Sequence, residues 1–362
     1  MKIIQIFPGK IWGGAEQYIL DLGRALHEQG HEVTYLARNS LVIKKRLQGK
    51  VPFRVLPFAG TWNIYSILRL SSILKEKEVD VIHIHDTGFV PIVTAAKSLS
   101  HSNVKIILTR HIARASSTFP LFRPMFKKLQ GMIFVSELAK KMWAGTNPWM
   151  PSAKMHVVHN SIPPSKEKSI TSPLRTRYHI SEDIPLIVFT GRVRRSKGCA
   201  ILVQALGEIR HLPFFVVFIG ACKPTDYHVH LLQLAKKCGI QDKILFHGFS
   251  DKVRLLIQDA DIGVAPSIVR EACPLSPMEF MQAGKCVIAT TNGAQPEYIT
   301  SGETGLLVPP NDPKKLGETL KIVLEQAKYR TALGEKAKLY FDNHLSYEKF
   351  ISRITKLYGY NM

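Results

Sequence analysis

The chain has 362 residues and carries 49 lysines and arginines against 28 aspartates and glutamates, a formal net charge of +21. This length exceeds what one hydrophobic core usually organises, and 45% hydrophobic with 21% charged residues is the composition of an ordinary soluble globular protein. No stretch approaches the roughly 18 consecutive apolar residues of a membrane-spanning helix. The opening "MKIIQIFPGK" is too short an apolar run for a secretory signal, so we expect a cytoplasmic protein.

The charge is unevenly distributed along the chain. Residues 1–165 hold 22 basic and 9 acidic residues, with local clusters at 44–50 and 123–128. Such an excess favours an anionic partner, either phosphate groups, an acidic membrane surface or nucleic acid, although a basic surface without a partner explains it equally well. All five cysteines lie in the second half and none forms a CxxC pair, which indicates reduced thiols rather than a disulfide or zinc framework.

The first half predicts alternating strands and helices. The stretch 15–30 has apolar residues at helical spacing and stops at Gly30, a natural C-terminal cap. Short apolar runs predict strands on either side of it. These runs are "KIIQIFP" (2–8), "HEVTYLA" (31–37), "VDVIHIH" (79–85) and "KIILTRH" (105–111).

The alternation lapses at residues 160–178, a stretch rich in Ser, Pro and Lys that we interpret as a linker. It then resumes with further apolar runs, at 184–191, 214–221, 243–249, 261–266 and 285–290. The sequence therefore predicts an α/β protein with two tandem, Rossmann-like, doubly wound domains. Because such sheets bind ligands outside the carboxyl ends of their strands, we expect the site in a cleft across which the domains face each other.

Two glycine-bearing turns follow predicted strands. In "PGKIWGGAEQ", Gly13 and Gly14 precede a helix whose free N–H groups could bind an anion, but a flexible turn explains the pair as well, and the stretch is not a GxGxxG dinucleotide fingerprint. In "FTGRVRRSKGC", Arg192 and Lys197 flank a turn and could both reach a phosphate. The neighbouring arginines 194 and 195 favour the alternative of a solvated basic loop.

The stretch "REACPLSPMEF" (270–280) holds two glutamates separated by two prolines. Ser276 to Glu279 matches the S-x-x-E capping box with proline at the first helical position, so we expect a helix from Pro277 to Gly284. A capping role then explains the presence of Glu279 at this position without any catalytic or binding function. Glu271 lies in the preceding loop, where the sequence shows no structural role for it.

Histidines end two of the predicted strands. "HIHD" (83–86) superficially resembles a metal site, but without a second set of ligands this indication is weak. His111 closes the strand 105–111, where a residue facing a ligand would be placed.

These segments together resemble the retaining, nucleotide-sugar-dependent glycosyltransferases of family 4, which have the GT-B fold. "GGAEQYILDLGRALHEQGHEV" is similar to the first βα unit of the family, and "VSELAKKM" and "VVHNSI" to the segments before its domain linker. "GRVRRSKG" matches its G-R-x-x-x-x-K-G turn. The most specific match is "PSIVREACPLSPMEFMQAGKCVIATTNGAQPEYITSGETGLLVPPNDP", which contains the E-x7-E pattern of the family.

The resemblance implies a role for each matched residue. Gly14, next to Gly13, would approach the phosphate or sugar of the donor, and His111 would contact the transferred sugar. Arg192 and Lys197 would neutralise the leaving diphosphate, Glu271 would bind sugar hydroxyls, and Glu279 the ribose diol. Backbone N–H groups of Cys273 and Leu275 would cradle the donor, while Pro274 between them has no N–H to give.

The resemblance also implies a reaction without a metal or other cofactor, because cationic side chains and a helix N-terminus can stabilise the leaving diphosphate. No residue is an obvious nucleophile, so front-face attack is favoured. Residues 1–165 would form the acceptor-binding domain, to which the amphipathic segment 346–362 would return, and residues 166–345 the domain that binds the nucleotide sugar.

We therefore expect a glycosyltransferase of lipopolysaccharide or other surface polysaccharide synthesis, with a nucleotide-sugar donor and a glycan or lipid-linked acceptor. The basic first domain suggests an anionic acceptor at the inner face of the cytoplasmic membrane. A basic nucleic-acid-binding protein is an alternative, against which stands the lack of a helix-turn-helix, zinc-finger or aromatic-interleaved basic motif. A nicotinamide-dependent oxidoreductase is a second alternative, disfavoured by the missing GxGxxG.

Overall fold

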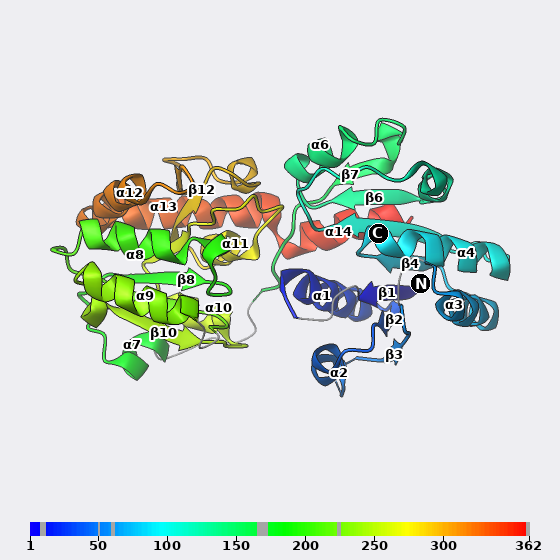
Figure 1. Ribbon diagram of the computed structural model, residues 1–362, viewed down its shortest axis with the longest axis horizontal. Helices are drawn as coiled ribbons and strands as arrows, with labels where there is room; N and C mark the ends of the chain where they lie inside the picture. Colours follow the sequence, from blue (N-terminus) through cyan, green and yellow to red (C-terminus); the bar gives the residue numbers. More distant parts are fainter. Residues whose placement is uncertain (8–11, 50, 59–61, 165–172, 223–225, 360–362) are drawn as a thin grey trace. The chain divides into compact units, whose positions relative to one another are not determined.

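The computed structural model of the chain describes residues 1–7, 12–49, 51–58, 62–164, 173–222 and 226–359. These residues form two compact units. Unit 1 comprises Met1–Asn160 together with Glu348–Met362, and unit 2 comprises Ser161–Tyr347. The sequence had placed the corresponding boundaries at 165/166 and 345/346. Figure 1 shows a sheet with helices packed against it in each unit.

The described part of unit 1 contains a parallel sheet in the order β3-β2-β1-β4-β5-β6-β7. Its central strands are short runs of β-branched and other apolar residues that are buried on both faces, as expected when helices cover a parallel sheet. The strands are β1 (Lys2–Phe7), β2 (Glu32–Ala37), β3 (Phe53–Val55), β4 (Val81–Ile84), β5 (Lys105–Arg110), β6 (Gly131–Phe134) and β7 (Met155–Val157).

Three helices of unit 1 begin after residues whose side chains cap the helix N-terminus. Ser40, Asn63 and Ser136 each accept a hydrogen bond from a backbone N–H of the first turn of their helix. The helices are α1 (Gly14–Glu28), α2 (Leu41–Leu47), α3 (Ile64–Glu76), α4 (Val90–Ser100), α5 (Arg123–Lys127), α6 (Glu137–Ala144) and α14 (Tyr347–Tyr358), whose residues from Glu348 onward belong to this unit.

The described part of unit 2 contains a second parallel sheet, in the order β10-β9-β8-β11-β12-β13. In both sheets the strand order reverses beside the first strand of the unit, between β1 and β4 and between β8 and β11, and ligands of such sheets bind at this point. The strands are β8 (Leu186–Thr190), β9 (Phe215–Ile219), β10 (Ile244–Gly248), β11 (Ile262–Ala265), β12 (Cys286–Thr290) and β13 (Leu306–Val308).

Most helices of unit 2 pack against its sheet through a continuous apolar core. One contact fixes the helix that carries Glu279: a side chain at Gly263 of β11 would lie 2.1 Å from the ring of Phe280, so the glycine allows this helix to lie close to the strand. The helices are α7 (Pro173–Tyr178), α8 (Cys199–Glu208), α9 (Asp226–Lys237), α10 (Val253–Leu256), α11 (Leu275–Gln282), α12 (Pro313–Glu325) and α13 (Ala327–Tyr340).

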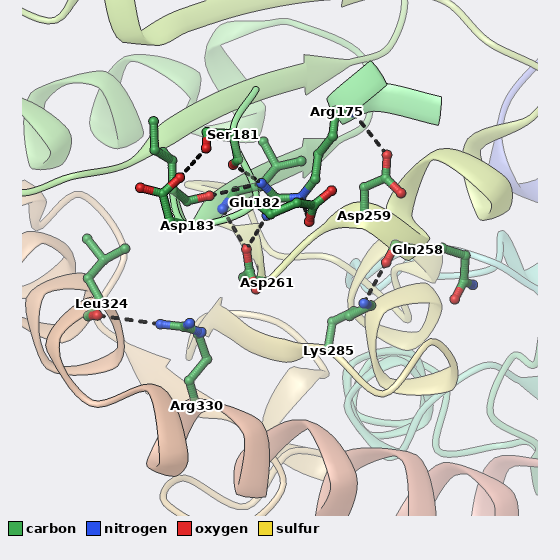
Figure 2. A network of polar contacts seen from close by, with 12 residues as sticks. Arg175, Ser181, Glu182, Asp183, Gln258, Asp259, Asp261, Lys285, Leu324 and Arg330 are labelled. Atoms are coloured by element: carbon green, nitrogen blue, oxygen red, sulfur yellow. Dashed lines mark hydrogen bonds and ion pairs between the residues drawn. The ribbon is translucent and has the colours of Figure 1, made fainter. Parts of the chain in front are cut away.

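A buried arginine holds the amino ends of two strands of unit 2 together (Figure 2). The guanidinium of Arg175, on α7, donates to Asp261 Oδ2 at 2.8 Å and to the carbonyl of Ser181 at 2.6 Å. The same Asp261 oxygen accepts from the N–H of Leu186, the first residue of β8. Asp259 Oδ2 accepts from backbone N–H groups in the first turn of α7 and so caps it. The network lies at the opposite edge of the sheet from the carboxyl ends.

Two details differ from the sequence-based expectations. The strands β3, β6, β7 and β13 were not predicted. The last six residues of the expected linker form helix α7, while residues 165–172 of that linker lie outside the described residues. The first helix ends at Glu28, and Gly30 follows it with the left-handed backbone (φ 82°) of a C-terminal cap, as predicted.

Candidate active site

Lys197 and Glu271 form an ion pair at the carboxyl ends of β8 and β11. The Lys197 ammonium lies 2.8 and 2.9 Å from the two Glu271 carboxylate oxygens, although the residues are 74 positions apart in the chain. The side chain of Lys197 is 27% exposed and that of Glu271 is 13% exposed. Ser267 also donates its hydroxyl to Glu271. The two strands flank the point where the strand order reverses, so the pair occupies the expected ligand-binding edge.

The backbone around this pair depends on two glycines. Gly198 has a left-handed conformation (φ 71°), and a side chain there would lie 1.8 Å from the carbonyl oxygen of Pro266. A side chain at Gly293 would lie 2.8 Å from the carbonyl oxygen of Glu271. That carbonyl accepts from the N–H of Ala294 at 3.0 Å. The lack of side chains at these two positions therefore brings Lys197 and Glu271 into place.

Helix α11 begins at Leu275, two residues before the predicted start, and the capping box is wrong. Pro274 is the residue before the helix, and no side chain caps it. The Ser276 hydroxyl instead lies 2.6 Å from that of Thr190, at the end of β8. Glu279 is a half-buried residue inside the helix, so capping does not explain it. The N–H groups of the first turn have no partner within the helix, and those of Leu275 and Ser276 point out of its N-terminus.

The arginines of the "GRVRRSKG" turn differ in their surroundings. Arg192, Arg194 and Arg195 are all exposed. The guanidinium carbon of Arg195 lies 5.4 Å from the centre of the Tyr227 ring, and Arg195 therefore has a packing role. Lys197 is the residue of this turn that contacts Glu271 directly, as described above.

In unit 1, Gly13 precedes α1 and Gly14 is its first residue. The helix carries Glu16 in its first turn, and a side chain at Gly13 would lie 3.3 Å from Glu16 Oε2. A carboxylate already stabilises this N-terminus. The turn is therefore better suited to a hydroxyl group than to a phosphate.

His111 follows β5 directly and lies in a buried network of uncharged side chains. Its Nε2 is 3.1 Å from His85 Nδ1, and His85 Nε2 is 2.8 Å from the Gln5 amide oxygen. Gln5 Nε2 lies 3.4 Å from the hydroxyl of Tyr358, at the end of α14. His83 Nδ1 is 2.6 Å from the same hydroxyl. The network, which we call the histidine network, thus joins β1, β4, β5 and the C-terminal helix.

Burial keeps the imidazoles of this network neutral. Desolvation lowers the pKa of His83 to about 3 and that of His111 to about 4, with the nearby His111 adding to the effect on His83. The pKa of His85 is lowered for the same reason. Near neutral pH each ring therefore carries one hydrogen and can donate one hydrogen bond and accept another.

The "HIHD" segment is not arranged as a metal site. Both nitrogens of His83 and both nitrogens of His85 contact protein groups. Besides the contacts described above, His83 Nε2 lies 2.6 Å from the Thr109 hydroxyl. Asp86 Oδ1 accepts from the N–H of Gly88. Within the described ranges, no group of three or more His, Cys, Asp or Glu side chains could hold a metal ion.

The sequence reading missed several residues that shape these two sites. Ser267 and Gly293 contact Glu271, and Thr190 contacts α11. Gly293 lies inside the long segment that resembled family 4, so the match itself was a signal. Gln5 and Tyr358 are 353 positions apart and belong to no motif, so no local pattern could have paired them.

Comparison with known proteins now relates both units to families. Residues 12–166 match the Glycosyltransferase Family 4 domain, and residues 172–340 match Glycosyl transferases group 1. The chain is 26% identical to an uncharacterized glycosyltransferase of Methanocaldococcus jannaschii, with 93% of each chain covered. It is 23% identical to the N-acetyl-alpha-D-glucosaminyl L-malate synthase of Bacillus anthracis, over 96% of this chain and 93% of that protein.

Solved structures show the same fold over the whole chain. A glycosyltransferase from Rickettsia africae superposes with a TM-score of 0.86 at 20% identity, covering 99% of this chain and 97% of the other. HepE of Anabaena, solved with UDP and glucose, gives a TM-score of 0.82 at 18% identity, covering 98% of each chain.

Neither the nucleic-acid-binding nor the nicotinamide-dependent alternative finds support among these relatives. Across the parts of the chain that the structure describes, no helix combines the length and apolar character needed to cross a membrane. The two matched domains account for nearly the whole chain, and their relatives include enzymes of lipopolysaccharide synthesis. The chain therefore belongs to the GT-B glycosyltransferases, with a family 4 domain in its first half and a group 1 domain in its second.

Proposed function

We propose that the chain transfers a sugar from a nucleoside diphosphate to a hydroxyl of a glycan or lipid-linked acceptor, with retention of configuration and without a metal ion. The Lys197–Glu271 pair carries this proposal. A cation and a carboxylate at the ligand-binding edge of unit 2 can bind different parts of one nucleotide sugar. The ammonium would bind the diphosphate, and the carboxylate would accept hydrogen bonds from sugar hydroxyls.

The other site residues take the roles that the family resemblance gives them. Arg192 and the N-terminus of α11, with the N–H groups of Cys273 and Leu275, bind the donor phosphates beside Pro274, and Glu279 binds the ribose diol. His111 and the Gly13–Gly14 turn contact the sugar. The acidic first turn of α1 supports a hydroxyl contact at Gly14 rather than a phosphate contact.

The reaction breaks the bond between the anomeric carbon and the diphosphate oxygen, which leaves with the electron pair. The acceptor oxygen forms the new bond on the same face, and its proton passes to the departing phosphate. Lys197 and the α11 N-terminus stabilise the negative charge that grows on the diphosphate. Glu271 is paired with an ammonium and a hydroxyl, which supports a binding role rather than that of a nucleophile.

A thermal-shift screen tests the proposed donor. UDP is the first nucleotide to try, since the similar Anabaena structures contain it, and GDP, ADP and the common sugar conjugates of all three complete the screen. A ligand present at 100 times its dissociation constant stabilises the folded state by about 2.7 kcal/mol. A melting temperature unchanged by every nucleotide would contradict the proposal.

Retention and metal independence are tested on the product. With an α-linked donor, NMR of the product should show an α linkage. The rate should be the same with EDTA and with added Mg²⁺. A β-linked product would exclude retention, and a rate that depends on Mg²⁺ would mean that Lys197 and α11 do not suffice as counter-charges.

We further propose that the acceptor is anionic and is reached at a membrane surface. Two long stretches of unit 1, residues 33–75 and 87–136, contain no Asp or Glu. Apolar side chains that follow the carboxyl ends of β3 and β5 are exposed, and the Trp62 and Phe122 rings, one from each region, lie 6.0 Å apart. This apolar surface comprises Trp62, Ile64, Tyr65, Leu68, Phe119 and Leu121. Exposed aromatic groups beside basic residues are typical of proteins that bind anionic membranes.

Vesicle sedimentation at physiological salt tests the membrane proposal. We expect binding to vesicles with anionic lipids and little binding to neutral ones. Replacing Trp62, Tyr65 and Phe119 by serine should abolish it. The matched control replaces Val229 and Leu232, which are similarly exposed on α9 of unit 2, and should change nothing. Equal, negligible binding of the wild type to both vesicle types would contradict this part of the proposal.

A further inference from the structure

An unbroken series of polar contacts links His111 to the last turn of the C-terminal helix. The series runs from His111 through His85 and Gln5 to the Tyr358 hydroxyl, with each pair of atoms between 2.8 and 3.4 Å apart. Its members are buried, apart from His111, which is half-buried at the carboxyl edge of the sheet. None of them except His111 has a role in the proposed reaction.

The amide of Gln5 sets the direction of this series. Its oxygen faces His85 Nε2 and can only accept, so His85 carries its hydrogen on Nε2. A neutral imidazole has a single hydrogen, and His85 Nδ1 is therefore an acceptor. His111 Nε2, 3.1 Å away, must then be the donor. This assignment of hydrogens, made from the network, leaves the lone pair of His111 Nδ1 available to a ligand hydroxyl.

Tyr358 contacts the nitrogen end of the Gln5 amide. Gln5 Nε2 donates to the Tyr358 oxygen, and the Tyr358 O–H is then available to His83 Nδ1 at 2.6 Å. Were the amide reversed, the Gln5 nitrogen would face His85, and the hydrogen of His111 would move to Nδ1. The orientation of the Gln5 amide, with its nitrogen on Tyr358 and its oxygen on His85, thus determines which nitrogen of His111 carries the hydrogen.

The position of Tyr358 is itself well determined. Its side chain is fully buried, and its backbone carbonyl accepts from the Lys105 ammonium at 3.0 Å. About two helical turns before it, Phe350 packs edge-on against Tyr18, whose ring also lies 4.7 Å from that of His111. The C-terminal helix therefore belongs to one end of the histidine network through Tyr358 and is linked to the His111 end through Tyr18.

We propose that Tyr358 and Gln5 are positioning residues for the transfer reaction, which hold His111 in the form protonated on Nε2 so that its Nδ1 accepts a hydrogen bond from a hydroxyl of the substrate. This inference rests on the proposed role of His111. It gives the C-terminal helix a part in the reaction, in addition to its packing on unit 1.

The test combines NMR of the full-length wild type, labelled with 15N histidine, with kinetics of single variants. We expect the His111 spectrum to show a hydrogen on Nε2. Tyr358→Phe removes only the hydroxyl, so a mixture of His111 tautomers should appear, and kcat should fall about tenfold, the equivalent of one hydrogen bond, with little change in KM for the donor. Gln5→Leu should act in the same direction.

Tyr35→Phe is the matched control, since Tyr35 is a buried tyrosine of the same unit whose hydroxyl contacts the Leu20 carbonyl rather than the histidines. It should leave the His111 spectrum and kcat unchanged. A wild-type His111 with its hydrogen on Nδ1 would overturn the proposal even if the variants failed to fold. So would a Tyr358→Phe enzyme as active as Tyr35→Phe. A wild type that transfers no sugar would instead contradict the proposed function, because the tautomer is measured without substrate.

Discussion

The sheets of unit 1 and unit 2 reverse their strand order at corresponding points, but the side chains gathered there differ in kind. In unit 2 the edge carries the partly exposed Lys197–Glu271 ion pair. In unit 1 it carries neutral histidines that contact one another and other uncharged groups. A cation paired with a carboxylate can exchange it for a phosphate, while a buried neutral network keeps a fixed geometry. The same architecture thus offers charge for the proposed donor in one unit and fixed hydrogen-bond directions in the other.

The composition of the chain allows the two units to be observed separately. All four tryptophans belong to unit 1 and all five cysteines to unit 2, so tryptophan fluorescence reports on the first and thiol labelling on the second. Labelling of the buried thiols requires opening of the fold, which makes it a measure of the stability of unit 2. The tryptophans are Trp12, Trp62, Trp143 and Trp149, and the buried cysteines are Cys199, Cys273 and Cys286.

The largest expected effect is that of Glu271→Gln. It should lower kcat by about a hundredfold or more, since the carboxylate is the proposed partner of the sugar hydroxyls. The same variant should bind UDP more tightly than the wild type, because Lys197 no longer has to break its ion pair with the Glu271 carboxylate before it binds the diphosphate. Steady-state kinetics and calorimetry measure the two effects.

The control for this prediction is Glu318→Gln, which removes the partner of Lys315 in an exposed pair of unit 2. Both its activity and its UDP affinity should equal those of the wild type. If Glu271→Gln kept normal turnover, Glu271 would not be a site residue.

Gly293→Ala should have the next largest effect. The added methyl group would lie 2.8 Å from the carbonyl oxygen and 3.0 Å from the nitrogen of Glu271, so this backbone must shift. We expect a loss of kcat of about tenfold or more, since a small displacement of a positioning group is costly. Gly145→Ala, whose nearest neighbour would be 3.4 Å away, is the control. Equal activity of the two variants would show that the Glu271 backbone is not held by this contact.

Acid should destabilise unit 1 through the histidine network. The pKa of His83 is lowered to about 3 and that of His111 to about 4, against 6.5 for an unperturbed histidine. Below pH 6.5 the unfolded chain therefore binds protons that the folded chain does not. The stability contributed by the neutral rings is complete above pH 6.5 and is lost as the pH falls toward 4, by up to about 1.4 kcal/mol per histidine and pH unit.

Urea titrations followed by tryptophan fluorescence and by thiol labelling measure this difference. The fluorescence midpoint should fall further between pH 7 and pH 5 than the labelling midpoint, because fewer histidines of unit 2 are buried. Parallel shifts of the two midpoints would mean that the network does not distinguish the units.

The smallest expected effect is that of Lys338→Ala. Lys338 and Asp342 form an ion pair whose side chains are about half exposed, so its loss should change the free energy of unfolding by no more than about 0.5 kcal/mol. Chemical denaturation followed by thiol labelling gives this value. A change of several kcal/mol would show that the exposure of an ion pair in unit 2 does not indicate how much the pair stabilises the fold. The same would then hold for the Lys197–Glu271 pair.

The sequence predicted the fold well because its signal is local. Strands such as β1 and β12 are short apolar runs between helical stretches, and their alternation implies parallel sheets. The predicted start of α11 was wrong for a physical reason. The S-x-x-E pattern at Ser276 fits a capping box, but the Ser276 hydroxyl contacts Thr190, which is 86 positions away, and no local pattern contains that contact.

The candidate site was predictable only in part. The family resemblance identified Lys197 and Glu271 as site residues. It did not predict that the two side chains contact each other across 74 positions of the chain. The sequence showed no structural role for Glu271, whereas in the structure Lys197 and Ser267 both contact its carboxylate. The "HIHD" segment drew attention for its metal-like pattern, whereas its histidines contact Gln5 and Tyr358, from the two ends of the chain.

Binding of UDP to the wild type and to Lys197→Met tests the central claim most directly. Lys315→Met, from the exposed pair of unit 2, is the control. If Lys197 exchanges Glu271 for the diphosphate of the donor, calorimetry should show UDP binding to the wild type and to the control with equal affinity. Lys197→Met should bind at least about tenfold more weakly, a loss of about 1.4 kcal/mol. Equal binding of UDP to all three proteins would contradict the account.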